Sequence, residues 1–180
     1  MDSSEANLPT LTIADRDQRD ALDRLIRDYH APVTRLAYRL LGWRGDVEDV
    51  VHDVFLAAFR KLPHFRSESS AWTWLAAITI NRCRSDYRKR LLRLKWLKGR
   101  TREREITSDV CGIERDETAA KVRDAVAKLS THDRELIVLH YLEELPIAEI
   151  CKLTGASDRT IHVRMHRARK RLKELLGDER

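Results

Sequence analysis

Residues 155–172 read GASDRTIHVRMHRARKRL, a glycine-containing turn followed by a helix that is rich in arginine and lysine. One set of apolar positions in this helix recurs at steps of four and three residues, so these positions share one side. They are Ile161, Met165, Ala168, Leu172 and Leu175. The cationic residues lie off this stripe, and their surface is either a solvated helix face or a contact for a polyanion.

The residues that precede the basic helix favour DNA as the polyanion. LPIAEICKLTG, residues 145–155, predicts a short helix that ends at Gly155, and Ser157 can cap the helix that follows. A short helix, a tight turn and a second helix form a helix-turn-helix, whose second helix enters the major groove with its N-terminal residues at base edges. The sequence therefore predicts a duplex-DNA surface on the basic helix.

Two groups of residues divide the expected contacts on this helix. Its leading turns carry the expected base readers, because Arg suits guanine, His donates or accepts, and Val can touch a thymine methyl. These residues, with the cap, are Ser157, Asp158, Arg159, His162 and Val163. Further along, phosphate contacts are expected to fix position without reading sequence. They come from Arg164, Arg167, Lys170 and Arg171.

Composition agrees with a DNA-binding protein and argues against several other classes. The chain has 180 residues, a formal net charge of +6 and a pI near 9.4. Its three cysteines are widely spaced and include no CxxC pair, which fits a reducing cytoplasm and predicts neither a zinc knuckle nor a disulfide framework. The apolar run at residues 74–80 is too short for membrane insertion, and no cofactor is expected.

Apolar residues recur at helical steps nearly throughout, so we expect an all-α fold of two small helical domains joined by a flexible linker. The expected divisions are a flexible N-terminal segment (1–16), a first helical domain (17–92), the linker (93–118) and a helix-turn-helix domain (119–180). Around Pro32 the pattern allows either one helix or two. Asp46 and a serine of residues 64–70 are expected to cap the following helices.

The first domain has its own candidate for nucleic-acid contact in residues 71–90, AWTWLAAITINRCRSDYRKR. This stretch combines aromatic and cationic side chains, a composition typical of proteins that bind unstacked bases. Trp74, Leu75 and Ile78 share one helix face and are expected in the core. The residues left freer to bind are Trp72, Asn81, Arg84 and Arg88.

Both halves of the chain resemble one known family. DVEDVVHDVFLAAFRKLPHFR (46–66) and WTWLAAITINRCRSDYRKR (72–90) look like region 2 of the extracytoplasmic-function (ECF) sigma factors of bacterial RNA polymerase. KLSTHDRELIVLHYLEELPIAEICKLTGASDRTIHVRMHRARKRLKEL (128–175) looks like their region 4. Together the resemblance covers about residues 20–90 and 119–176, in the family's order.

The resemblance implies a subunit without a catalytic site that binds core RNA polymerase and directs it to promoters. Region 4 would read the −35 element as a duplex and bind the β flap. Region 2 would capture the −10 element through Phe65, Arg66, Ser67, Trp72, Asn81, Arg84 and Arg88. It would dock on the β′ clamp through Asp46, Asp49, Val50, Asp53 and Phe55. An anti-sigma factor is a further partner that the resemblance suggests.

Three other interpretations of the sequence remain open. Residues 129–162 also resemble the helix-turn-helix of response-regulator-type transcription factors, although the first half lacks the strand pattern of a receiver domain. His52-Asp53 and His132-Asp133 could belong to a metal-dependent phosphohydrolase, and His162 with His166 could hold a metal. A pure interaction protein would leave the basic faces solvated and show no salt-dependent affinity for DNA.

Overall fold

The computed structural model describes residues 13–42, 47–65, 70–97 and 117–177. Within these ranges the regular elements are all helical, which confirms the predicted all-α fold. The helices are α1 (Ile13–Leu40), α2 (Val47–Lys61), α3 (Ala71–Leu97), α4 (Glu117–Ala127), α5 (Thr131–Ile137), α6 (Ile147–Thr154) and α7 (Asp158–Gly177). A 3-10 turn, η1 (Leu62–His64), follows α2, and a π-helical turn, η2 (Val138–Leu142), continues α5.

Several predictions lie wholly or partly outside these ranges. They concern the N-terminal segment as far as residue 12, the cap Asp46, the residues Arg66 and Ser67, and positions 98–116 of the linker. The described chain adds that α3 continues to Leu97, past the predicted domain end at residue 92. None of the described helices combines the length and the apolar character that a bilayer crossing needs.

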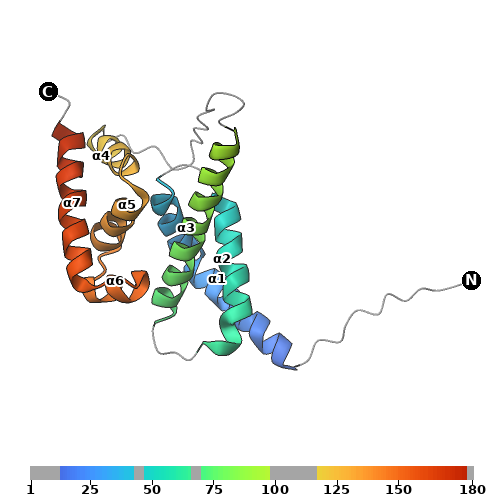
Figure 1. The fold of residues 1–180 in the computed structure, drawn as a ribbon. Coiled ribbons are helices and arrows are strands. Elements are labelled where there is room, and N and C mark those ends of the chain that lie inside the picture. The colour runs from blue at the N-terminus through green and yellow to red at the C-terminus, as the bar shows by residue number, and fades with distance from the viewer. Residues whose placement is uncertain (1–12, 43–46, 66–69, 98–116, 178–180) are drawn as a thin grey trace, which may run out of the picture.

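The first half of the chain is a bundle of α1, α2 and α3 (Figure 1). α1 runs through Pro32 without a break, so the pattern there belongs to one helix. A proline in a helix interior costs about 3 kcal/mol, because it donates no hydrogen bond and crowds the preceding turn. The residues after it offset this cost, since Val33, Leu36 and Ala37 are completely buried.

The other two helices of the bundle complete its core. Val54 of α2 and Leu75 of α3 are fully buried, as predicted for the apolar face of α3. α3 begins at the serine cap that the sequence predicts, because the N–H of Thr73 donates to Ser70 Oγ at 3.0 Å. The bundle therefore fixes which side of α3 faces the core and which side carries Asn81 to the surface.

The second half consists of α4 to α7, and its buried side chains belong to one cluster that continues into the first half. Leu139, Ile150 and Ile161 are fully buried at its centre. α5 starts at the predicted cap: Ser130 Oγ accepts from the N–H of Asp133 at 3.2 Å and donates to its carboxylate at 2.7 Å. The apolar stripe predicted for α7 supplies much of this core, because Ile161 packs there with Met165 and others of the set.

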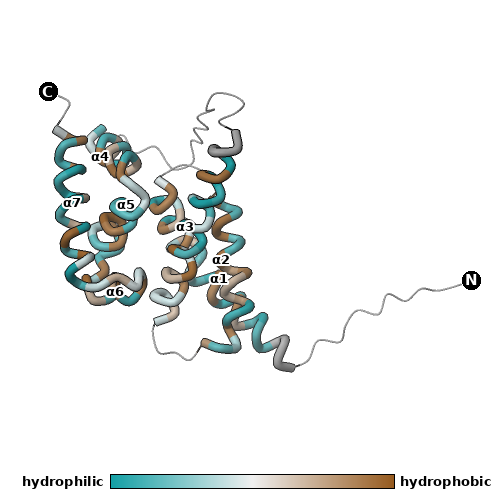
Figure 2. Tube along the Cα trace, viewed as in Figure 1, coloured by the Kyte–Doolittle hydropathy of each residue, from teal (hydrophilic) through white to brown (hydrophobic). Residues whose placement is uncertain are grey.

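The two halves lie against each other. In Figure 1 the group α4–α7 stands beside the bundle, and α5, η2 and α6 make the contacts with α1 and α3. In Figure 2 the trace of α7 is mainly hydrophilic, with apolar residues at intervals along it. This arrangement leaves the outer side of α7 away from the contact between the halves.

Candidate nucleic-acid interface

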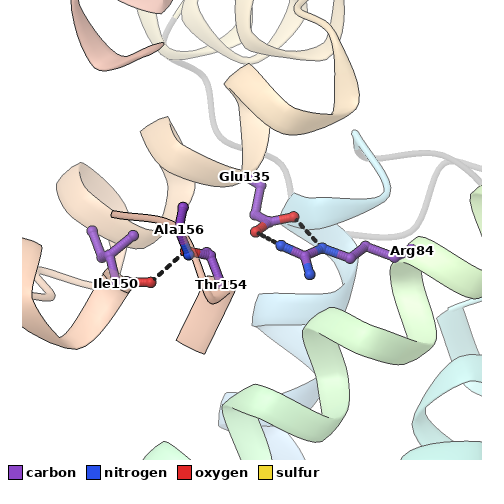
Figure 3. Close-up of polar contacts among 5 residues, drawn as sticks. All are labelled: Arg84, Glu135, Ile150, Thr154 and Ala156. Atoms are coloured by element: carbon purple, nitrogen blue, oxygen red, sulfur yellow. Dashed lines mark hydrogen bonds and ion pairs between the residues drawn. The ribbon is translucent and has the colours of Figure 1, made fainter. Parts of the chain in front are cut away.

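α6 and α7 meet at a tight turn whose geometry is set by two residues. Gly155 has φ of +71°, in the left-handed region, and its N–H donates to the carbonyl of Cys151 at 2.9 Å. The hydroxyl of Thr154 donates to the carbonyl of Ile150 at 2.7 Å and accepts from the N–H of Ala156 at 3.4 Å (Figure 3). The turn thus ends α6 with its carbonyls bonded and sets the direction in which α7 starts.

The first turn of α7 is organised around its predicted cap. The N–H of Thr160 donates to Ser157 Oγ at 3.3 Å, and the two hydroxyls lie 2.8 Å apart. One turn on, the carboxylate of Asp158 and Nε2 of His162 are 3.5 Å apart, and both side chains are exposed. Ser157 therefore acts as the N-cap of α7, while Asp158 and His162 contact each other on the exposed side of the helix.

The remaining predicted contacts of α7 all lie on its exposed side. Ile161, Met165 and Ala168 are buried, so the opposite face of the helix is turned to solvent. The exposed residues are Arg159, Val163, Arg164, Arg167, Lys170 and Arg171. Arg171 pairs with Glu174 in the next turn at 3.0 Å, an exposed contact that contributes little to stability. The structure therefore gathers the predicted base readers and phosphate contacts on one surface.

In the first half, Asn81 is exposed beside a shallow groove between α2 and α3. The groove has a volume of about 210 Å³ and is lined by Ala57, Lys61, Ile78, Asn81, Arg82 and Ser85. Lys61, Arg82 and Ser85 were not among the sequence predictions. The spacing of three and four residues from Ile78 through Asn81 and Arg82 to Ser85 was a signal that these α3 positions share a side. Arg88, further along α3, is exposed as well.

Arg84 occupies a different environment, because it is engaged by the second half of the chain. Its Nε and Nη2 donate to the two carboxylate oxygens of Glu135 in α5, at 2.9 and 2.6 Å (Figure 3). The side chain of Glu135 is only 5% exposed, and that of Arg84 is 26% exposed. The expectation that Arg84 is free for contact is therefore wrong for this conformation.

The predicted aromatic contacts are partly packed into the bundle. Trp72 is half-buried and stacks on Tyr29 of α1, with ring centroids 6.4 Å apart. Phe65 is half-buried against Trp74 at 4.8 Å. The expectation that Trp72 is free of the core is corrected, because apolar ring area is more stable against another ring than in water.

On α2, the predicted polymerase surface divides into exposed and buried residues. Val50 and Phe55 are 5% and 7% exposed, so they are core residues, and their prediction as contacts is corrected. Asp49 is exposed, and Asp53 is partly exposed with its carboxylate 4.0 Å from Arg82. Sequence reasoning missed Leu56, an apolar side chain that is 38% exposed on the same side as these carboxylates. A mixed acidic and apolar surface results.

The metal-site interpretations have no support in the described ranges. These ranges contain no group of three or more His, Cys, Asp and Glu side chains that could hold a metal ion. His52 and His132 are both exposed, each on a separate helix. The His-Asp pairs at residues 52–53 and 132–133 therefore do not come together with further ligands in the described ranges.

Family comparisons agree with this geometry. Residues 25–92 match the family model described as "Sigma-70 region 2", and residues 119–172 match "Sigma-70, region 4". The chain is 31% identical over 161 residues to the ECF RNA polymerase sigma factor SigM of Mycobacterium tuberculosis, covering 88% of this chain and 79% of that one. It is 34% identical over 138 residues to the RNA polymerase sigma factor NccH of Alcaligenes xylosoxydans xylosoxydans, covering 73% and 74%.

Solved structures give the same result for the fold. The sigma factor RpoE of Bartonella quintana, in complex with the anti-sigma factor NepR, has a TM-score of 0.68 and 26% identity, covering 90% of this chain and 99% of that one. CnrH in complex with the cytosolic domain of CnrY has a TM-score of 0.63 and 28% identity, covering 90% and 91%.

The chain thus carries both sigma regions in the family's order, each on the half of the structure where the sequence places it. SigM is similar over most of both chains at more than 30% identity. This chain belongs to the extracytoplasmic-function sigma factors of the sigma-70 family, which direct promoter-specific initiation of transcription.

Proposed function

We propose that this sigma factor recognises its promoter through two separate surfaces, the outer side of α7 for the −35 element and the exposed side of α3 for the −10 element. The observation that carries the proposal is the exposed basic surface of α7, which begins directly after a helix-turn-helix turn fixed by Gly155. Helix α7 would enter the major groove with its first turns at the base edges.

On α7, the base-reading group is Arg159, His162 and Val163, since these lie on the first exposed turns. Asp158 would orient His162 through their 3.5 Å contact. The phosphate group is Arg164, Arg167, Lys170 and Arg171, whose charges bind without regard to sequence. Ser157 acts as the cap that holds the first turn in place.

On α3, Asn81 is proposed to contact the −10 strand, with Lys61 and Arg82 of the adjoining groove as phosphate contacts. Arg88, which is exposed, extends this surface along the helix. Phe65 and Trp72 would take part only through their exposed edges. Arg84 joins the surface when its pairing with Glu135 is broken.

The proposed polymerase contact is the mixed surface of α2, formed by Asp49, Asp53 and Leu56. Carboxylates around an exposed apolar residue resemble the core and rim of a protein interface, and we assign the β′ clamp to this surface. The β flap is proposed to bind the second half. We also propose that the chain itself has no catalytic site, which the family's role as initiation factors supports.

An anti-sigma factor is a proposed further partner. The solved relatives RpoE and CnrH are described in complexes, RpoE with the anti-sigma factor NepR and CnrH with the cytosolic domain of CnrY. Their similarity to this chain over 90% of its length supports a partner of this kind here. Purification of the chain from native cells, followed by identification of any equimolar partner, tests this point.

The response-regulator alternative is less well supported. A receiver domain alternates strands with helices, whereas α1, α2 and α3 form an all-helical bundle in the described part of the first half. The alternative also leaves the match of residues 25–92 to sigma region 2 without a role.

The test is co-purification with host core RNA polymerase, followed by transcription in vitro from fragmented host DNA. Defined start sites that appear only with this chain are expected, and their alignment gives the promoter sequence. Two matched variants separate the surfaces. Asp53→Lys should abolish co-purification, whereas Asn81→Ala should keep it and reduce the transcripts. Loss of both activities in both variants, with folding intact, would contradict this division of roles.

A further inference from the structure

We propose that Glu135 is an internal counter-anion that holds the polymerase-free chain closed and occupies Arg84 until the two halves separate. The role of Arg84 toward DNA rests on the proposed function, whereas the closed state does not. The pair joins α3 to α5 across 51 residues of sequence, with two hydrogen bonds of 2.9 and 2.6 Å. A two-point contact of this kind is the strongest geometry available to arginine and a carboxylate.

Because Glu135 is buried, loss of its partner Arg84 has a large energetic cost. The carboxylate of Glu135 is almost fully removed from water. A charge in such a position is strongly disfavoured without its partner, so breaking the pair while the halves stay together is costly. Separation of the halves releases Arg84 and lets water reach the face of α3 that it occupies. The pair is therefore stable in the closed chain and is lost when the chain opens.

Further contacts join the same surfaces and make the closed state a specific one. Arg39 of α1 pairs with Glu143 at 2.7 Å and donates to the carbonyl of Leu142 at 3.0 Å. Arg134 of α5 donates to the carbonyl of Leu40, at the end of α1, at 3.3 Å. A cation at a helix C-terminus is favoured by the carbonyls that have no partner there.

Gly42 completes this contact. It lies two residues after the end of α1 with φ of +72°, and a Cβ at this position would collide with the guanidinium of Arg134. A side chain at residue 42 would be strained at this φ and would displace the guanidinium of Arg134 from its contact with the end of α1. Arg134 also donates to the carbonyls of Ala127 and Leu129 in its own half, so it links three chain segments.

The chemistry of these contacts suits a reversible closure. Charged groups and backbone carbonyls carry the contacts named above and add to the apolar residues that also join the halves. Interfaces between domains of one chain are typically more polar than obligate ones and allow relative motion. The carboxylate of Glu135 presents two oxygens to Arg84, as a DNA phosphate would. Promoter DNA and Glu135 therefore compete for one guanidinium, and Arg84 becomes available to DNA when the halves separate.

The experiment uses the full chain and the variant Glu135→Gln, which keeps the side-chain shape and removes the charge. Small-angle X-ray scattering should give a larger radius of gyration than for the wild type. Affinity for a fluorescein-labelled pool of random-sequence single-stranded DNA should rise roughly fivefold to tenfold, because the apparent affinity scales with the fraction of open chain. Circular dichroism checks that the helices remain.

Glu174→Gln is the matched control, since it breaks an Arg–Glu pair inside α7 and changes the net charge by the same amount. Its radius of gyration should equal that of the wild type, and its DNA affinity gives the increment caused by removing one carboxylate and releasing an arginine that is already exposed. The charge-swapped chain Arg84→Glu with Glu135→Arg should be as compact as the wild type, because the pair is restored in reverse.

The outcomes separate the two parts of the inference. A Glu135→Gln chain as compact as the wild type overturns the closed state held by this pair. If Glu135→Gln unfolds, Arg84→Gln opens the contact from the α3 side and decides the question by the same scattering measurement. Expansion without a gain in DNA affinity beyond the Glu174→Gln control upholds the closed state and overturns Arg84 as a DNA contact.

Discussion

The two halves of this sigma factor hold their cationic side chains in different states. On α7, residues such as Arg159 and Arg167 are exposed on a helix whose other side is fixed in the core. On α3, Arg84 is bound by a buried carboxylate from the other half. The proposed −35 surface is thus exposed in the free chain, whereas the proposed −10 surface has one of its cations, Arg84, held by the other half. One chain therefore holds exposed cations on α7 and a cation on α3, Arg84, that is already paired.

The largest expected effect tests whether the halves also fold separately. Leu139 is fully buried in the α4–α7 core, so Leu139→Ala should cost about 2–5 kcal/mol of unfolding free energy in that half. Thermal unfolding followed by circular dichroism should then show an early transition for α4–α7 and a later one for the bundle. A single transition shifted as a whole would show that the contact between the halves makes them one folding unit.

The next effect concerns the exposed surface. Arg159→Ala should lose about 1–3 kcal/mol of binding at its own base pair and relax the preference there, because a base-edge contact is removed. Transcription from a library of −35 sequences with polymerase holoenzyme measures this change.

Arg167→Ala is the contrasting variant on the same helix face. It should weaken binding to all sequences alike and reduce the slope of log affinity against log salt by about 1. If the two variants change sequence preference to the same extent, the division of α7 into base readers and phosphate contacts is wrong.

Much of α7 could be predicted from sequence because its determinants are local. The apolar steps that include Ile161 and Met165 fix the buried side, and Gly155 and Ser157 mark the turn and the cap. Each of these signals lies within a few residues of the structure that it sets. The exposed cations follow as the remainder of the helix surface.

The pairing of Arg84 could not be predicted in the same way. Arg84 and Glu135 are far apart in sequence, and no local pattern pairs them. Val50 and Phe55 were assigned to a partner because the family motif includes them, yet helical geometry turns both toward the bundle core. The helix through Pro32 was ambiguous for a related reason, since burial of Val33 and Leu36 outweighs the local effect of proline.

A smaller effect is expected at the turn before α7. Gly155→Ala should destabilise the α4–α7 half by about 1–2 kcal/mol, because an L-residue is strained at φ of +71°. No atom lies within 4 Å of the added Cβ, so collision does not contribute. Gly155→Asn should cost less, since asparagine tolerates this conformation. Equal losses for the two variants, measured by chemical denaturation, would contradict backbone strain as the cause.

The smallest expected effect is the reactivity of Cys83, a buried residue of α3 near the contact between the two halves. Burial, with the nearby charges of Asp86 and Glu135, raises the pKa of the Cys83 thiol from 9.0 to about 12. Cys83 should therefore react with iodoacetamide at mildly alkaline pH far more slowly than Cys151, which is partly exposed. Peptide mass spectrometry measures both rates, and similar rates would show that the α3 side is open to solvent.

The same shift has a consequence for stability at high pH. Because the pKa of Cys83 is higher in the folded chain, its contribution to stability is complete below pH 9.0 and is lost as pH rises toward about 12. Cys83→Ser should remove that part of the alkaline decline, which titration of the denaturation midpoint would detect.

Gly42 has a consequence for how this sequence can change over time. A side chain at position 42 would meet the guanidinium of Arg134, so a substitution at either site alters the constraint on the other. Because φ of +72° strains an L-residue whatever the space, position 42 should stay glycine even in descendants that exchange Arg134 for a shorter residue. Position 134 should therefore change before position 42 does, and that change would record when a lineage gave up this joint between its two halves.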